Sequence, residues 1–315
     1  MMLLADAAPP APSAREVMAR AETENFPVAS RVLPRRARAH LLAVYGFARL
    51  VDELGDSAPG DRLAALDWLE GELDRAFAGT AEHPLMRRLS LTVRECDLSR
   101  EPFARLIEAN RTDQRVARYE TWEQLRGYCA LSADPVGEIV LGVFGVATQA
   151  RVALSDSICT ALQLAEHCQD VAEDYAAGRV YLPREDLERF GCELESTGLK
   201  AADALAQSAG AAVAVAPTAS PSYEQQRLAS ERLRDVLGFE VARGRRLLDE
   251  GAPLIDQLHG RERLAVAAFH AGGRAAFAAI ERAGFNVLDE PPTASTPRRL
   301  QALLATLLKR PAATE

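Results

Sequence analysis

Apolar residues recur at intervals of three and four along nearly the whole chain, as in helices that bury one face. One such stripe consists of Leu63, Leu66, Leu69 and Leu73. No segment shows the alternation with a period of two that is typical of a half-buried strand. Prolines and glycines divide the periodic runs into helices of roughly 12 to 25 residues with short connections. The pattern therefore predicts an all-α fold.

The same punctuation predicts how the chain is organised. We expect residues 1–19 to be a disordered or loosely ordered tail, and residues 20–290 to form a single helical domain. Within that domain, residues 200–222 are rich in alanine and predict a low-complexity insertion. Residues 291–315 form a proline-rich segment with a last short helix, which we expect from Arg298 to Lys309.

Composition and charge narrow the classes of function. The 315 residues are 48% hydrophobic and 26% charged, which excludes wholesale disorder and a disulfide scaffold. The net charge is −8 and the sequence contains no basic block, so we expect no nucleic-acid partner. The five scattered cysteines predict a reducing, cytoplasmic environment. No apolar run approaches the ~20 residues that span a bilayer, and peripheral contact with the inner membrane stays open.

The strongest local signal is a motif that runs from Tyr45 to Asp56. On a helix, Tyr45, Arg49, Asp52 and Asp56 stand at offsets of 0, 4, 7 and 11 and share one narrow face. Two carboxylates four residues apart repel each other by a few tenths of a kcal/mol in water. For one such pair alone, a solvated acidic face is the more economical interpretation.

A second copy of this spacing changes that interpretation. Gln163, His167, Asp170 and Asp174 stand at the same four offsets, and Glu166 lies on the edge of their stripe. The residues around them are apolar, so this helix is expected to be largely buried, where uncompensated carboxylates are costly. Mg²⁺ offsets that cost, since it binds one or two carboxylates together with waters and phosphate oxygens. We therefore expect the two acidic stripes to bind Mg²⁺ and, through it, a diphosphate.

Other metals and other chemistry fit less well. A di-iron bundle needs Glu-x-x-His motifs on two helices, and neither stripe contains one.

After the second stripe, Gly178 predicts the end of the helix, and Arg179 and Tyr181 follow directly. A guanidinium at that point is suited to grip phosphate, although the tetrapeptide alone predicts only a turn.

Together these motifs resemble the squalene/phytoene synthase family, the head-to-head trans-isoprenyl diphosphate synthases. The resemblance runs from about Glu24 to about Leu288 and includes a middle motif with Tyr128, Val136 and Gly137. It implies a single-domain terpenoid-synthase helical bundle around a central apolar cavity, with the two acidic stripes facing each other across its mouth. It implies Asp52, Asp56, Asp170 and Asp174 as metal ligands, and we expect Glu166, on the edge of the second stripe, to join them.

Within the family, three features are most similar to the hopanoid-pathway hydroxysqualene synthase branch. They are the segment from Glu24 to Ser30, the Ser132-to-Gly137 motif, and Gln169 directly before Asp170, where most relatives have arginine. One departure from the family is Glu166, which stands where asparagine is usual.

That branch implies a reaction and roles for the remaining residues. Presqualene diphosphate ionises, its carbocation rearranges, and water captures it to give hydroxysqualene and diphosphate, with roughly two or three Mg²⁺ ions and no NADPH. The residues that the resemblance implies in catalysis are Tyr45, Arg49, Asp52, Asp56, Asp170 and Asp174. The diphosphate would contact Arg49, Gln163, Arg179 and Tyr181, and the cavity wall would include Phe26, Phe47, Tyr128, Val136 and Gly137.

Two alternatives remain from the sequence. The first is a prenyltransferase that joins two prenyl diphosphates, such as farnesyl diphosphate, into presqualene diphosphate, squalene or phytoene. The second is a non-catalytic helical subunit. The four acidic residues of the two stripes argue against it, because a purely structural subunit does not need them: Asp52, Asp56, Asp170 and Asp174.

Overall fold

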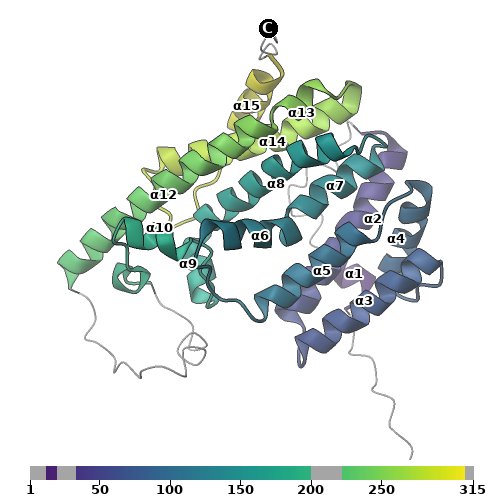
Figure 1. Ribbon diagram of the computed structural model, residues 1–315, viewed down its shortest axis with the longest axis horizontal. Coiled ribbons are helices and arrows are strands. Elements are labelled where there is room, and N and C mark those ends of the chain that lie inside the picture. The colour runs from purple at the N-terminus through teal and green to yellow at the C-terminus, as the bar shows by residue number, and fades with distance from the viewer. Residues whose placement is uncertain (1–11, 20–32, 200–221, 309–315) are drawn as a thin grey trace, which may run out of the picture. The chain divides into compact units, whose positions relative to one another are not determined.

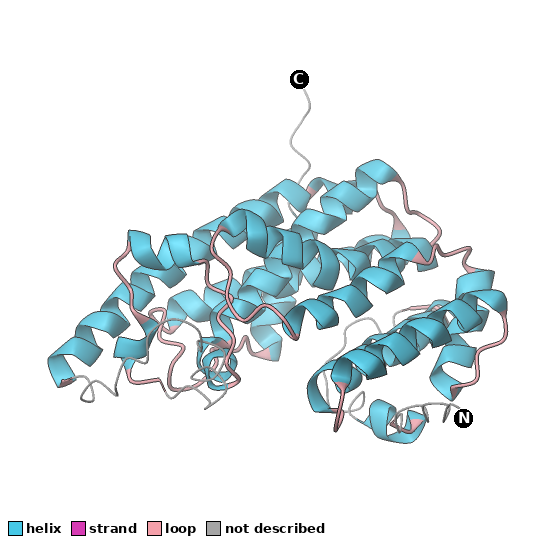
Figure 2. Ribbon diagram, turned by 60° about the horizontal axis from the view of Figure 1, so that its bottom comes forward, coloured by secondary structure: helices cyan, strands magenta, loops and turns pink. Residues whose placement is uncertain are grey.

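The computed structural model describes residues 12–19, 33–199 and 222–308. These residues form helices joined by loops, and no β-strand occurs among them (Figure 2). One isolated β-bridge joins Arg118 and Val180. The prediction of an all-α fold is confirmed.

The elements follow one another along the chain as labelled in Figure 1. They are α1 (Ala14–Ala19), α2 (Arg35–Asp52), the π-helix η3 (Glu53–Ser57), α3 (Arg62–Ala78), α4 (Pro84–Glu95), α5 (Glu101–Asp113), α6 (Trp122–Ser132), α7 (Asp134–Val143), α8 (Gln149–Gln169), α9 (Val171–Ala176), α10 (Arg184–Arg189), the 3₁₀-helix η4 (Leu194–Thr197), α12 (Tyr223–Gly251), α13 (Pro253–Asp256), α14 (Gly260–Arg282) and α15 (Thr296–Leu308).

The chain forms two compact units, each built from three separate segments. The first unit contains Met1–Arg115, Ala130–Asp156 and Leu258–Ala265. The second contains Val116–Cys129, Ser157–Gln257 and Val266–Glu315. The expectation of one domain over residues 20–290 stays a prediction.

The ends of the chain differ in part from expectation. Within the tail that the sequence predicts to be loosely ordered, α1 is a helix, and its Val17 is buried in the core of the first unit. This helix is only six residues long, so its apolar spacing is too short to stand out in the sequence. The last helix is present as expected, as α15, whereas the alanine-rich insertion at 200–221 lies outside the described residues.

The first unit packs around aromatic and leucine side chains of α2 to α5. Phe47 and Phe103 are completely buried, and their rings meet edge to face with centroids 5.3 Å apart. The apolar stripe read from the sequence, which includes Leu66 and Leu69 of α3, lies in this core with no exposed surface. Burial of such side chains contributes about 1.5–3 kcal/mol each.

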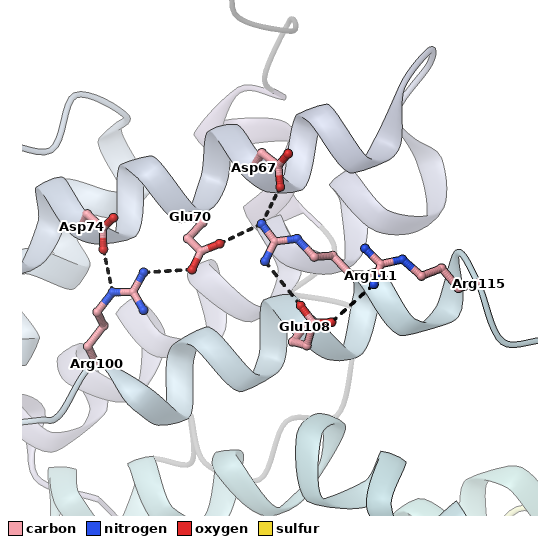
Figure 3. A network of polar contacts seen from close by, with 7 residues as sticks. All are labelled: Asp67, Glu70, Asp74, Arg100, Glu108, Arg111 and Arg115. Carbon is pink, nitrogen blue, oxygen red and sulfur yellow. Dashed lines mark hydrogen bonds and ion pairs between the residues drawn. The ribbon is translucent and has the colours of Figure 1, made fainter. Parts of the chain in front are cut away.

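An ion-pair network ties α3 to α5 outside that core (Figure 3). Arg111 contacts Asp67 at 2.6 Å and Glu70 at 2.8 Å, and Arg100 contacts the other oxygen of Glu70 at 3.0 Å. The hydrogen bond from Arg111, with that from Arg100, lowers the pKa of the Glu70 carboxyl. Arg115 lies at the end of this network, where its guanidinium is 3.7 Å from the Glu108 carboxylate of α5.

In the second unit, α12 and α14 are in very close contact. A Cβ atom at Gly244 of α12 would lie 2.1 Å from Cζ of Phe277, a fully buried ring on α14. The absence of a side chain at Gly244 therefore lets the two helices approach.

A buried charge cluster joins α12 to α10. Arg243 Nη1 donates to Glu240 Oε1 at 2.6 Å and to Asp186 Oδ2 at 2.8 Å. The guanidinium also lies 4.5 Å from the centroid of the Trp122 ring. Glu240 is completely buried, its Oε2 has no hydrogen-bond partner among the described residues, and burial raises its pKa to about 8. A protonated Glu240 is thus the form that this site favours near neutral pH.

We predict that Gly244→Ala lowers the free energy of unfolding by about 1–3 kcal/mol, because the new methyl group displaces the Phe277 ring. The matched control is Gly71→Ala in α3, where the nearest atom to the added Cβ is 3.7 Å away. At that position alanine should raise stability by about 0.5–1 kcal/mol through helix propensity. Urea unfolding followed by circular dichroism measures both, and equal shifts would contradict the prediction.

We also predict that Glu240→Gln changes how stability depends on pH. Between about 4.5 and 8 the folded wild type holds a proton that the unfolded chain releases, so its stability falls as pH rises. The loss is at most about 1.4 kcal/mol per pH unit. Glutamine keeps the acceptor for Arg243 without titrating, so the wild type should lose stability relative to the variant from pH 5 to pH 8. A difference that stays constant in urea unfolding across this range would refute the assignment.

Candidate active site

The first acidic stripe begins on α2. Tyr45 is buried, and Arg49 Nη1 lies 3.6 Å from Asp52 Oδ2, one helical turn further on. The Asp52 side chain is 47% exposed, so one side of its carboxylate faces solvent.

The stripe does not continue to Asp56 as a regular α-helix, and the place of Asp56 on its face stays a prediction. The α-helix ends at Asp52, and the next five residues form the π-helix η3. A π-turn has more residues per turn than an α-turn, so the step from Asp52 to Asp56 differs from that of a regular α-helix. Such single π-turns occur frequently at functional sites.

Contacts from α5 explain why the helix widens here. A Cβ atom at Gly55 would lie 2.0 Å from Oδ1 of Asn110, so only glycine permits this approach. The Gln114 amide, just after α5, donates to the Gly55 carbonyl at 3.0 Å and to the Asn110 carbonyl at 3.2 Å. In the sequence, the feature that could have indicated this irregularity is Gly55 itself, because a glycine inside a helical motif can mark a close approach of another segment.

The second acidic stripe is interrupted at Asp170 but keeps its spacing. Helix α8 ends at Gln169, and Asp170 has φ −100° and ψ 17° before α9 begins at Val171. Across this break, the Asp170 amide bonds to the Glu166 carbonyl at 2.9 Å, and the Asp174 amide bonds to the Asp170 carbonyl at 2.8 Å. The four-residue steps of the predicted stripe therefore persist.

His167 is a buried member of that stripe and packs against an aromatic ring. Its ring stacks on Tyr181 with centroids 3.9 Å apart, and burial lowers its pKa to about 3, so the imidazole is neutral. Gln163 Nε2 lies 3.3 Å from His167 Nε2, and with that amide as donor the imidazole proton is on Nδ1. Nδ1 in turn lies 4.0 Å from Asp174 Oδ2, so the proton faces the carboxylate.

Three tyrosines continue the stack away from His167. The rings of Tyr128 and Tyr181 have centroids 5.5 Å apart, and Tyr119 lies 5.4 Å from Tyr128 and 5.9 Å from Tyr181. We call Tyr119, Tyr128 and Tyr181 the tyrosine cluster. The sequence predicted site roles for Tyr128 and Tyr181 and missed Tyr119, which lies outside every motif.

The turn after α9 places Arg179 and Tyr181. Gly178 has φ +86° and ends the helix as predicted, and the Arg179 amide bonds back to the Asp174 carbonyl at 2.8 Å. The Val180 amide then bonds to the Ala117 carbonyl at 2.8 Å. A cavity of about 10 Å³, room for one water molecule, lies among Asp174, Arg179, Tyr181 and His167. An anionic oxygen at this point would meet a guanidinium and a phenol.

The carboxylates of the second stripe fit the demands of Mg²⁺. Burial, and then the charge of Glu173, raises the pKa of Asp170, which is the electrostatic cost that a bound cation offsets. Among the described residues no three His, Cys, Asp or Glu side chains converge into a metal centre. Mg²⁺ does not need such a centre, because water and phosphate complete its six ligands. Glu166 is exposed, and its predicted role as a ligand stays a prediction.

The structure separates the remaining predicted site residues. Phe47 lies in the core of the first unit, not at a cavity wall, because its edge-to-face contact with Phe103 leaves no exposed surface. Gly137 is buried in α7, and Val136 packs against that core. Phe26 lies outside the described residues. The central cavity and the facing of the two stripes stay predictions.

Comparison with known proteins places this arrangement in a class. Residues 19–301 match the squalene/phytoene synthase family, and the chain belongs to it. This is a family of enzymes that act on prenyl diphosphates. Hydroxysqualene synthase of Rhodopseudomonas palustris is 36% identical over 248 residues, which are 75% of this chain and 83% of that protein. The enzyme of the same name from Sinorhizobium fredii is 38% identical over 56% of this chain and 60% of its own length.

A solved structure gives the same result for the fold. The crystal structure of squalene synthase HpnC from Alicyclobacillus acidocaldarius is 45% identical and has a TM-score of 0.72, covering 87% of this chain and 93% of that one. The predicted family, its terpenoid-synthase helical bundle, and the similarity to hydroxysqualene synthases are thereby confirmed.

Proposed function

We propose that the protein is a Mg²⁺-dependent hydroxysqualene synthase that converts presqualene diphosphate and water to hydroxysqualene and diphosphate. The proposal rests on one arrangement: Asp174, Arg179, Tyr181 and a neutral His167 line one small cavity, and Asp170 stands four residues before Asp174, whose amide bonds to its carbonyl. The relatives named hydroxysqualene synthase support the choice of substrate.

The diphosphate end of the substrate would be held by cations. Asp52, Asp56, Asp170 and Asp174 would hold Mg²⁺, which neutralises the charge that develops on the leaving diphosphate. Arg179 would add direct donors to its oxygens. The C–O bond breaks and its electron pair leaves with the diphosphate.

The carbocation end would face aromatic rings. Tyrosine faces attract cations, by about 2 kcal/mol or more where water is excluded. Tyr128 and Tyr181 are each 7% exposed, so their rings are largely shielded from solvent. After rearrangement, the oxygen of one water molecule bonds to the cationic carbon and the water loses a proton.

Gln169 favours a substrate with one diphosphate. Most relatives carry arginine before this aspartate, whereas the Gln169 amide here donates to the Pro292 carbonyl. The side chain is engaged by backbone and brings no second positive charge to the stripe. An enzyme that joins two prenyl diphosphates has two leaving groups to neutralise, and one that consumes presqualene diphosphate has one.

The competing function is head-to-head prenyl transfer. Phytoene synthase of Mycobacterium tuberculosis is 32% identical over 57% of this chain. Incubation with Mg²⁺ and either presqualene or farnesyl diphosphate in H₂¹⁸O distinguishes the two. Hydroxysqualene that contains one ¹⁸O, formed from presqualene diphosphate alone, supports the proposal. Efficient formation of presqualene diphosphate, squalene or phytoene from farnesyl diphosphate would replace it.

We predict that Asp52→Asn and Asp170→Asn each lower kcat by about 100-fold or more, because each removes a charge that would hold Mg²⁺ against the leaving diphosphate. Asp249→Asn is the matched control: Asp249 is 64% exposed, pairs with Arg274 at 3.0 Å and belongs to neither stripe. Helical content should be unchanged in all three. Retention of full turnover by either stripe variant would exclude that aspartate as a metal ligand.

A further inference from the structure

Helix α15 carries an exposed row of leucines. Leu300, Leu304 and Leu308 are 56%, 52% and 78% exposed, and they are three of the six large hydrophobic side chains exposed among the described residues. Their spacing of four places them along one side of the helix, over a length of about 12 Å. We call these three residues the leucine row.

The helix is held to its unit by small residues elsewhere on its surface. Ala302 packs against Ala275 and Ala279 of α14 and against Ala294. Leu303 and Leu307 are half-buried as well, whereas the three leucines of the leucine row stay exposed. The helix therefore packs through one part of its surface and exposes a row of leucines on another, so it is apolar on more than one side. A helix of this kind normally packs against a second surface as well. No described helix is long and apolar enough to cross a membrane.

The charge of this segment is opposite to that of the chain. Residues 291–315 contain the four basic residues Arg298, Arg299, Lys309 and Arg310 and one acidic residue, Glu315, whereas the whole chain carries a net charge of −8. Arg298 and Arg299 are both exposed at the start of α15. Exposed leucines flanked by basic residues are the features of helices that lie in a bilayer interface.

We propose that α15 docks the protein on a lipid bilayer with anionic headgroups, the leucine row entering the interface and the arginines meeting the headgroups. Each basic residue near such a surface contributes about 1 kcal/mol, and the effect falls off within a Debye length. A second copy of this chain fits the surface poorly. Two α15 helices would bring like charges together, and a row of three leucines is far short of the ~800 Å² per partner of a stable interface.

The test is flotation of the full chain with vesicles. Flotation requires no catalytic activity, so its result is independent of whether the proposed reaction is correct. The wild type should float with mixed phosphatidylglycerol and phosphatidylcholine vesicles and much less with phosphatidylcholine alone. The variant L300Q/L304Q/L308Q should lose binding by about tenfold or more. The variant R298Q/R299Q should lose mainly the preference for anionic lipid.

The matched control is L91Q/L228Q, which removes two exposed leucines from α4 and α12. It should float like the wild type, and circular dichroism should show equal helical content in every variant. As a second readout, Leu304→Trp should shift its emission to the blue on addition of anionic vesicles.

Three outcomes would overturn the proposal. One is a wild type that binds neither kind of vesicle, and another is a leucine-row variant that binds as well as the control. The third is a leucine-row variant that changes the mass measured by light scattering while vesicle binding stays the same, which would assign the row to a second copy of the chain.

Discussion

The second unit depends on the stacked contact between His167 and Tyr181. The 3.9 Å separation joins α8 to the turn after α9, and it keeps the imidazole dry and neutral. In the neutral His167 ring, Nε2 accepts from the Gln163 amide, and Nδ1 lies 4.0 Å from the Asp174 carboxylate. Because the same turn carries Arg179, this aromatic contact helps to fix where Asp174 and Arg179 lie beside His167.

Both acidic stripes lie where a helix loses its regularity. The first enters a π-turn at Glu53, and the second breaks at Asp170. A regular helix satisfies its own backbone and leaves carboxylates aligned only by the 3.6-residue repeat. An irregular turn re-aims a carboxylate at the cost of ordinary helix geometry, and here outside contacts such as Gln114 to Gly55 offset that cost.

The sequence predicted what local patterns determine. Apolar spacing predicted the helices that the structure shows, because a helix depends on residues within a few turns of each other. The repeated offsets of Asp52 and Asp170 predict metal binding, which stays a prediction. It missed the π-turn and Tyr119, which depend on contacts between distant segments: Asn110 against Gly55, and Ala117 bonded to Val180. Phe47 was misplaced for a related reason, since burial beside Phe103 follows from tertiary packing alone.

The interleaving of the two units has a consequence for synthesis. The first unit takes its last segment from Leu258–Ala265, and the second begins at Val116. A ribosome that adds about 5–20 residues per second therefore releases most of the second unit before the first is complete. The core of α2 to α5 draws only on residues from Ala14 to Val143 and so can pack earlier, but no single cut in the chain separates one whole unit from the other.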